Sequence, residues 1–370
     1  MSRFRFTTSV LTALIGALAL SVGAHAQSPR NVILCIGDGM GPEHVRAAGL
    51  YLNGEAGTLS FEAFPAQGTL STGAANNPIT DSAASATALA TGRKVNTGVI
   101  SVAVPGDGRP LTTILERAQQ AGKRVGMVTT SELTHATTAA FAAHTRKRAQ
   151  RAAIAQDFLH MSRPDVLLGG GGAGMTAKNA IDAGYILAQS RSELFAAQRN
   201  KSLPLCGLFG IGNMPYEYED FTGSAQMYRQ YPHLREMTMT AIDLLDDDPD
   251  GFFLLVEGGR IDQAAHHQNI ERTIHETIEF ARTVEEIVQW AKDRDDTLII
   301  VTADHETGGL AITRENGKGE YPKATWSTWG HTPVDVGVYA TGVGASLFSG
   351  SHDNADLPGL IDRAGEQIAE

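Results

Sequence analysis

Three acidic residues, Asp38, Glu257 and Asp304, each follow closely after a short apolar run in the sequence. Ligands in open α/β sheets bind beyond the carboxyl ends of the strands, so these carboxylates are expected at one sheet edge if the apolar runs are strands. Carboxylates gathered in one place repel one another unless cations neutralise them. The spacing therefore predicts a site that binds metal ions.

Histidines supply further candidate ligands. Asp262 and His266 are four residues apart, so one helical turn would direct both side chains at one ion. His305 follows Asp304 directly, and His331 precedes another apolar run. Carboxylates combined with imidazoles suit zinc, whereas carboxylates combined with a threonine hydroxyl suit magnesium. Each pair alone is more typical of a surface turn, and it is their joint placement at strand ends that indicates metal binding.

Ser82 is the candidate nucleophile. It follows Asp81, a residue type that often caps helices, and it precedes an alanine-rich run that ends near Gly92. Ser82 is therefore expected in the first turn of a helix, where free N–H groups and the helix dipole favour an anion. The alternative is an ordinary serine at a helix N-terminus, but this interpretation gives no reason for metal ligands to face it.

The elements that must position these residues alternate between strands and helices. Short apolar runs predict buried strands at residues 31–36, 125–129, 166–168, 252–256, 298–302 and 336–339. Apolar residues at helical spacing predict helices at residues 111–121, 234–245 and 271–292. This alternation predicts an α/β fold of three layers, α/β/α, around a large and mostly parallel central sheet.

The first 26 residues contain two arginines, an apolar stretch and then Ala24-His25-Ala26, a pattern typical of a cleaved signal peptide. We therefore expect a periplasmic or secreted protein in which residues 27–370 form a single domain. No later segment approaches the roughly 20 apolar residues of a membrane span. The formal net charge of −11 makes the chain acidic, so no nucleic-acid-binding surface is expected.

Cys35 and Cys206 are the two cysteines of the chain. One disulfide between them is an alternative in an oxidising compartment. Because Cys35 lies within a predicted buried strand, we expect two buried thiols instead.

Several segments are similar to motifs of the alkaline phosphatase family and occur in the family's order. They are Asp38-Gly39-Met40-Gly41, Thr80-Asp81-Ser82-Ala83-Ala84, Val256-Glu257-Gly258, Ile261-Asp262 with His266, Thr302-Ala303-Asp304-His305-Glu306-Thr307-Gly308-Gly309 and Gly330-His331-Thr332. The resemblance extends from Asn31 to about Gly344 and is weakest in the middle third. It implies an enzyme that hydrolyses small-molecule phosphate monoesters through a phosphoserine, and it leaves a monomer and a homodimer open.

The resemblance also implies two zinc ions and one magnesium ion. The first zinc ion would be held by Asp262, His266 and His331. The second would be held by Asp38, Asp304 and His305, with Ser82 facing it. Magnesium would be held by Asp38, Thr137 and Glu257. Arg148 matches the arginine that binds phosphate in the family, because it falls at the expected distance after Thr137, and Arg146 is the alternative.

Two positions depart from the family's usual pattern. Many bacterial members have an acid beside the magnesium site where this chain has His135, and Gln263 stands where others have a lysine near the phosphate. Histidine is a softer ligand than a carboxylate and is neutral when unprotonated, so the metal of the third site is left open.

Two other functions are alternatives. The first is a phosphodiesterase or sulfatase of the same superfamily; a sulfatase is disfavoured because Ser82-Ala83-Ala84 lacks the C/S-x-P-x-R context of its modified nucleophile, and a diesterase usually uses threonine. The second is a non-catalytic exported protein that sequesters zinc or phosphate, which would have no need of Ser82 facing a metal.

Overall fold

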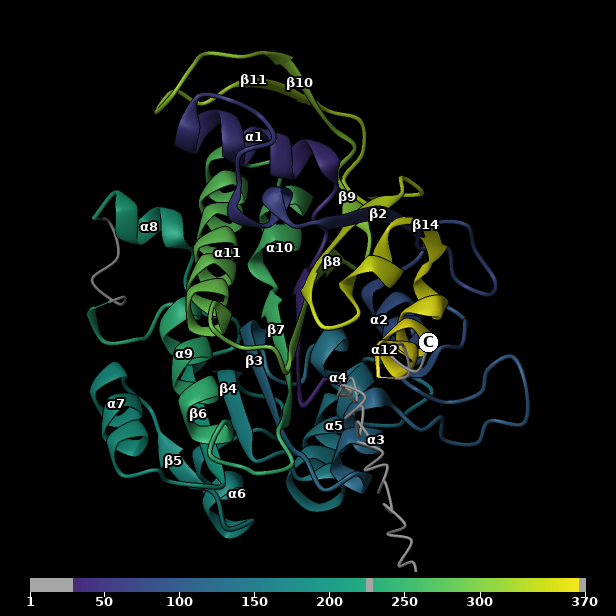
Figure 1. Ribbon diagram of the computed structural model, residues 1–370, viewed down its shortest axis with the longest axis vertical. Coiled ribbons are helices and arrows are strands. Elements are labelled where there is room, and N and C mark those ends of the chain that lie inside the picture. The colour runs from purple at the N-terminus through teal and green to yellow at the C-terminus, as the bar shows by residue number, and fades with distance from the viewer. Residues whose placement is uncertain (1–28, 224–228, 366–370) are drawn as a thin grey trace, which may run out of the picture.

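The computed structural model describes residues 29–223 and 229–365, so the predicted signal peptide lies outside the described residues. A ten-stranded sheet runs through the molecule (Figure 1). In spatial order its strands are β14 (Gly350–Asp353), β2 (Ala66–Ser71), β13 (Val336–Gly342), β8 (Thr297–Ala303), β1 (Asn31–Gly37), β7 (Phe252–Gly258), β3 (Arg124–Glu132), β4 (Val166–Gly171), β6 (Leu205–Ile211) and β5 (Ile186–Ala188). Strand β13 runs antiparallel to both of its neighbours, and the other pairs are parallel. The mostly parallel sheet is thus confirmed.

All six predicted strands are present in this sheet. Strands β2, β5, β6 and β14, which lie toward the two sides of the sheet, were not predicted. The sequence of β2, Ala-Gln-Gly-Thr-Leu-Ser, buries only some of its residues and contains no apolar run. Apolar runs identify strands that are covered on both faces, whereas strands near a sheet edge carry a weaker signal.

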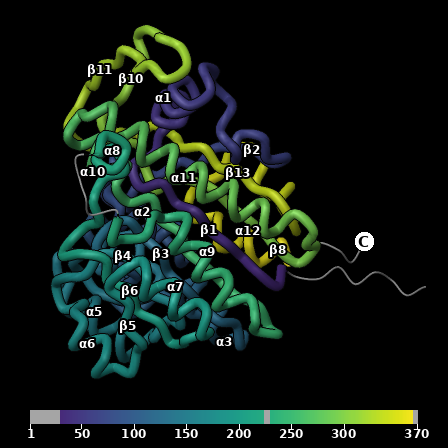
Figure 2. Tube along the Cα trace, turned by 90° about the vertical axis from the view of Figure 1, so that its left-hand side faces the viewer, coloured from purple at the N-terminus to yellow at the C-terminus, as the bar shows by residue number. Residues whose placement is uncertain are grey.

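Helices cover both faces of the sheet, which gives the three predicted layers. One layer contains α1 (Pro42–Asn53), α7 (Arg191–Arg199), α8 (Glu217–Phe221), α9 (Leu234–Leu245), α10 (Arg260–His266) and α11 (Ile270–Ala291). The other contains α2 (Ser82–Thr91), α3 (Ile114–Gln120), α4 (Ala136–Ala142), α5 (Arg151–Gln156), the π-helix η2 (Asp157–Ser162) and α12 (Leu357–Ala364). Helix α6 (Ala177–Asp182) packs at the edge strand β5. Figure 2 views the molecule from the side that α7, α9 and α11 cover.

Helix α9 has the predicted bounds, and α11 differs from its prediction by one residue at each end. The prediction for residues 111–121 began too early. Thr113 caps α3, since its hydroxyl accepts a hydrogen bond from the backbone N–H of Glu116 at 3.1 Å while the Glu116 carboxylate accepts one from the N–H of Thr113 at 2.9 Å. This capping box starts the helix at Ile114.

The segment between Glu306 and His331 forms two small sheets. Strands β10 (Leu310–Arg314) and β11 (Lys323–Trp326) make a hairpin that lies over α1, at the top of Figure 1. Strand β9 (Glu306–Thr307) pairs with β12 (His331–Thr332), with His331 opposite Thr307. This second pairing brings His331 beside the end of β8.

Both cysteines are buried and free. Cys35 lies in β1 and Cys206 in β6, with β7, β3 and β4 between them. The expectation of two buried thiols is therefore confirmed. Among the described residues, no helix has the length and apolar character needed to cross a membrane.

Candidate active site

The carboxyl ends of β1, β7 and β8 lie level with one another. Gly37 of β1 is in register with Gly258 of β7 and with Ala303 of β8, so Asp38, Glu257 and Asp304 meet at one edge of the sheet. All three carboxylates are fully buried. The gathering of acids that the sequence predicted is therefore present.

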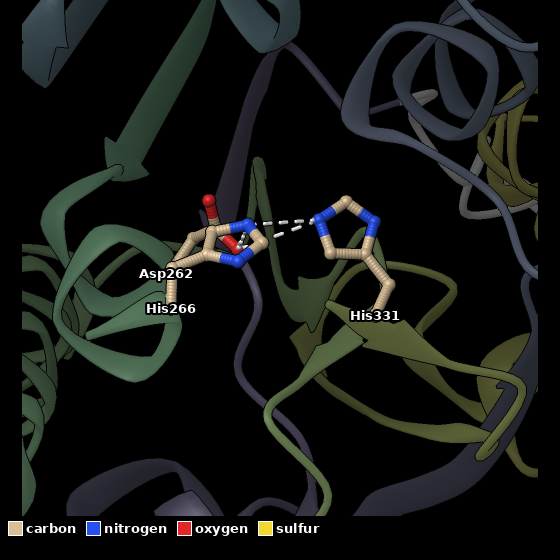
Figure 3. Close-up of side chains that lie close together, drawn as sticks. All are labelled: Asp262, His266 and His331. Atoms are coloured by element: carbon tan, nitrogen blue, oxygen red, sulfur yellow. Dashed lines mark hydrogen bonds and ion pairs between the residues drawn. The ribbon is translucent and has the colours of Figure 1, made fainter. Parts of the chain in front are cut away.

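Asp262, His266 and His331 form one group whose ligand atoms all lie within 4.8 Å of one another (Figure 3). Asp262 and His266 share a face of α10, with His266 Nε2 at 3.3 Å from Asp262 Oδ1. The Nε2 atoms of His266 and His331 are 3.2 Å apart. Two imidazole nitrogens beside a carboxylate oxygen make a ligand set typical of zinc.

Backbone carbonyls fix the orientation of both imidazoles. His266 Nδ1 donates to the carbonyl oxygen of Trp329 at 2.5 Å, and His331 Nδ1 donates to that of Thr80 at 2.8 Å. Since a carbonyl only accepts, each Nδ1 carries a proton, and in the neutral imidazole this leaves the lone pair of Nε2 for a metal ion.

Asp38, Asp304 and His305 form a second group around Ser82. His305 Nε2 lies 3.3 Å from Asp304 Oδ2 and 3.2 Å from the Ser82 hydroxyl. Asp304 Oδ1 accepts hydrogen bonds from the backbone N–H groups of Gly39 and His305, both at 3.0 Å. These bonds hold the carboxylate so that its other oxygen, Oδ2, faces His305.

Asp38 also belongs to a third group with His135 and Glu257. Thr137 lies at the same place, and its hydroxyl acts to lower the pKa of the Glu257 carboxyl. Thr137 Oγ1 nevertheless has no hydrogen-bond partner of good geometry among the described residues. Thr129 donates to Glu257 Oε2 at 2.5 Å. This group is rich in oxygen, as magnesium prefers, with one imidazole added.

Several buried atoms of the second and third groups have no hydrogen-bond partner among the described residues. They are Asp38 Oδ2, Asp304 Oδ2, Glu257 Oε1, Thr137 Oγ1 and His135 Nδ1. A buried polar atom without a partner is costly, and all five are atoms that can ligate a metal ion. The residues present therefore fit bound divalent cations.

Burial also raises the pKa values of Asp38, Glu257 and Asp304. Burial, followed by repulsion from Asp304, raises the pKa of Asp38 well above its usual value. Burial is also the main cause that raises the pKa of Glu257 to about 7 and that of Asp304 to about 8. Cations bound among these carboxylates would favour their ionised forms and reverse the shifts.

Ser82 is the first residue of α2 and is almost completely buried. Asp81 caps the helix, because its Oδ1 accepts from the backbone N–H of Ala84 at 3.1 Å. The Ser82 hydroxyl lies 3.5 Å from Asp38 Oδ1. The predicted cap and helix are confirmed, and the helix N-terminus directs this hydroxyl at the second ligand group.

Arg148 reaches the site, whereas Arg146 does not. The Nη1 atom of Arg148 donates to Asp81 Oδ2 at 3.0 Å, and its Nη2 lies 3.2 Å from His135 Nε2. The guanidinium of Arg146 lies beside Gly108 instead. Arg148 is thus the arginine that contacts Asp81, the residue before Ser82.

The profile of the alkaline phosphatase family matches residues 29–322. The chain belongs to the alkaline phosphatase family. Alkaline phosphatase 3 of Bacillus subtilis is 32% identical over 90% of this chain and 88% of its own length. Streptomycin-6-phosphate phosphatase of Streptomyces griseus is 33% identical over 96% of this chain and 95% of its own length.

Solved alkaline phosphatases have the same fold. The enzyme from the Antarctic bacterium TAB5 is 28% identical and superposes with a TM-score of 0.79, covering 92% of this chain and 99% of its own. The cold-active enzyme from Shewanella sp. is 30% identical, with a TM-score of 0.79 over 92% of this chain and all of its own. This alkaline phosphatase family member is a metal-dependent enzyme that hydrolyses phosphate monoesters.

Sequence reasoning missed the part that Thr307 plays. Its hydroxyl donates to Asp262 Oδ1 at 2.5 Å and lies 3.2 Å from His305 Nδ1. It therefore contacts a ligand from each of the first two groups. Thr307 lies within a segment that resembles the family, but neither its residue type nor its spacing indicates that it contacts two candidate ligand groups.

Gln263 and His135 lie beside the ligands in different ways. Gln263 Nε2 donates to the hydroxyl of Ser131 at 3.2 Å, and its Oε1 accepts from Arg260. His135 Nδ1 is 3.7 Å from Asp38 Oδ2, so His135 is close enough to the third group to act as a ligand itself. The side chain of Gln263 contacts Ser131 and Arg260 instead.

Glu217, His233 and Glu279 form a fourth group, away from Ser82 and between α8, α9 and α11. Here protein cations already balance the acids: Arg235 pairs with Glu279, and His233 Nδ1 lies 2.9 Å from Glu217 Oε2. The group ties three helices together by ion pairs.

Proposed function

We propose that this alkaline phosphatase family member transfers the phosphoryl group of its substrate to Ser82 and then to water. The observation that carries the proposal is that the Ser82 hydroxyl lies 3.2 Å from His305 Nε2 and 3.5 Å from Asp38 Oδ1. A structural serine would gain nothing from such buried metal-ligating neighbours.

We propose two zinc ions and one magnesium ion as cofactors. The first zinc ion would be held by Asp262, His266 and His331, and the second by Asp38, Asp304 and His305. Magnesium would be held by Asp38, Thr137 and Glu257, with His135 at the same place. When bound, these cations lower the pKa of the serine hydroxyl and stabilise the negative charge on entering and departing oxygens. The unpartnered oxygens of Asp38, Asp304 and Glu257 support this assignment.

The protein residues have separate tasks in the proposed reaction. Ser82 Oγ loses its proton and attacks phosphorus, and the bond from phosphorus to the alcohol oxygen breaks. The departing alcohol takes up a proton. Water then attacks the phosphoserine, which releases inorganic phosphate and returns the Ser82 hydroxyl. Arg148 binds two phosphoryl oxygens with its planar guanidinium, which suits the dianion of a monoester.

The charge of the site supports a dianionic substrate. Counting the four ligating acids, three divalent cations, Arg148 and an ionised Ser82, the site carries about +2 although the chain as a whole is acidic. Phosphate monoesters would thus be drawn to this one place on the protein.

We also propose that residues 1–26 are a signal peptide, that residues 27–370 form a single catalytic domain, and that the enzyme is periplasmic or secreted. The test is the N-terminal sequence of the enzyme recovered from periplasmic and extracellular fractions. A mature N-terminus at Gln27 is expected, and retention of Met1 in active enzyme would overturn the proposal.

The phosphoserine is tested by brief incubation with radiolabelled substrate at acidic pH, followed by quenching and peptide mapping. Label is expected on the peptide that contains Ser82. Label on another residue, or rapid turnover in which no label is ever trapped, would count against Ser82 as nucleophile.

The rival phosphodiesterase and sulfatase activities can be separated from monoesterase activity with three chromogenic substrates. We expect p-nitrophenyl phosphate to be hydrolysed far faster than bis-p-nitrophenyl phosphate or p-nitrophenyl sulfate, because Arg148 and the cations suit two phosphoryl charges. A preference for either rival substrate would reverse the assignment of substrate class.

A further inference from the structure

The segment that carries Arg148, residues 143–150, is neither helix nor strand. Its backbone is held by residues 98–101. Ile100 and Thr145 exchange two backbone hydrogen bonds of 2.9 Å, and the N–H of Arg148 donates to the carbonyl of Gly98 at 2.8 Å. Gly98 in turn donates its N–H to the Asp81 carboxylate, the partner of the Arg148 guanidinium. The position of Arg148 therefore depends on how firmly these two segments are joined.

His144 also joins the segment of residues 143–150 to residues 98–101. Its Nδ1 is 2.8 Å from the carbonyl oxygen of Ser101, and its Nε2 is 2.8 Å from Glu116 Oε1. A backbone carbonyl and a carboxylate are both acceptors, so each ring nitrogen must carry a proton. His144 is therefore held as an imidazolium.

The surroundings of His144 agree with this protonation state. The charged groups that act most on the ring are two acids, Glu116 from α3 and Asp157 from η2. Burial alone lowers the pKa of His144, but the hydrogen bonds to Glu116 and Ser101 outweigh it and raise the pKa above its ordinary value. Asp157 also accepts a hydrogen bond from the backbone N–H of His144 at 3.1 Å.

Ser101, the partner of His144, connects this contact to both helices of the active site. Its N–H donates to Thr87 of α2 at 3.0 Å, and its hydroxyl donates to the carbonyl of Ala140 in α4 at 2.5 Å. Ser101 also has a positive φ of 43°, a conformation that a serine keeps only where its surroundings hold it. The ring of His144 thus attaches the arginine segment to a fixed point between the helices of Ser82 and Thr137.

We propose that His144 is a positioning residue for Arg148, holding the arginine segment through its two hydrogen bonds so that the guanidinium meets phosphate at Ser82. His144 belongs to none of the ligand groups found among the described residues, so its proposed action is through Arg148. The inference rests on the proposed role of Arg148 in binding phosphate.

The test compares wild-type enzyme with His144→Ala, using p-nitrophenyl phosphate as substrate and inorganic phosphate as competitive inhibitor. We expect KM and the inhibition constant of phosphate to rise about tenfold, with a smaller change in kcat and an unchanged metal content. His160→Ala is the matched control, because His160 is an exposed histidine on the neighbouring η2. His144→Gln keeps much of the side-chain volume, and its KM and inhibition constant of phosphate should lie between those of wild type and His144→Ala. It is the variant to measure if His144→Ala folds poorly.

Rescue by imidazole separates positioning from general stability. A surface cavity of about 640 Å³ is lined by His144, Glu116 and Asp157, so imidazole can reach the space that His144→Ala opens. Imidazole should restore phosphate affinity in this variant more strongly at pH 6.5 than at pH 8, because only the protonated form has two N–H donors. Equal rescue at both pH values, or none, would contradict the imidazolium contact.

A double-mutant cycle decides whether His144 acts through Arg148. In an Arg148→Ala background, His144→Ala should cost less than twofold in phosphate affinity, because the group that it positions is gone. If His144→Ala costs the same tenfold in both backgrounds, the inference is overturned while the role of Arg148 stands. If Arg148→Ala itself leaves phosphate affinity unchanged, the proposed role of Arg148 and this inference both fail.

Discussion

Asp81 accepts a hydrogen bond from the guanidinium of Arg148 at 3.0 Å through Oδ2, and its Oδ1 caps the helix that begins with Ser82. One carboxylate therefore fixes both the serine and the arginine. Asp81 and His135 contact one terminal nitrogen each of this guanidinium, and a guanidinium has five N–H groups, so donors remain for a phosphoryl group attacked by Ser82. The arrangement is preorganised, which reduces the entropy that binding must overcome.

Ser82→Ala should lower kcat by about three orders of magnitude or more and abolish the phosphoenzyme, because no other hydroxyl takes the place of the nucleophile. Alanine is a good helix former, so the thermal midpoint should change little. The measurements are steady-state kinetics and trapping of labelled enzyme, with exposed Ser192→Ala on α7 as control. Turnover near the wild-type value would remove Ser82 from the mechanism.

Thr307→Val should weaken binding of the zinc ion held by Asp262, His266 and His331. Valine has the shape of threonine but cannot donate to Asp262 Oδ1, and loss of such a supporting contact typically costs about 10- to 100-fold in metal affinity. The check is zinc content and activity across a series of zinc-buffered solutions. Thr313→Val, at an exposed position on β10, is the control, and an unchanged zinc affinity in Thr307→Val would contradict the expected contact.

Asp304→Asn should stabilise the metal-free protein at alkaline pH while inactivating the enzyme. Burial and neighbouring acids raise the pKa of Asp304 from 3.8 to about 8. Since the folded state holds this proton more tightly than the unfolded state, stability is lost as pH rises through that range. Asparagine cannot ionise, and its oxygen can still accept from Gly39 and His305. Thermal unfolding of chelated protein should show a midpoint raised by a few degrees at pH 8 and little changed at pH 4; a lowered midpoint at pH 8 would be the contrary result.

His135→Asp should increase the preference of the third site for magnesium over zinc, because a carboxylate is a harder ligand than an imidazole. Activity measured against magnesium concentration at fixed zinc should reach its plateau at lower magnesium than in the wild type. His160→Asp controls for the added charge, and identical magnesium curves for His135→Asp and wild type would show that His135 does not influence this site.

The sequence by itself determined the central strands, the cap and start of α2, and the bounds of α9. Each of these depends on local physical chemistry: unbroken apolar runs form strands covered on both faces, and Asp81 caps the helix through its nearest free N–H groups. The acids at the ends of β1, β7 and β8 were also predictable, because parallel strands bring their carboxyl ends to one edge. The pairing of Asp262 with His266 followed from helical spacing alone.

Only the tertiary structure decided how the remaining contacts form. The β9–β12 pairing places His331 against His266, Thr80 and Trp329 hold the two imidazoles through backbone carbonyls, and Thr307 joins two ligand groups. Carbonyl oxygens belong to every residue, so the sequence cannot mark which of them will accept from a particular histidine. Contacts of this kind depend on the path of the backbone in space, which is fixed by the packing of the whole chain and not by the type or spacing of the residues that make them.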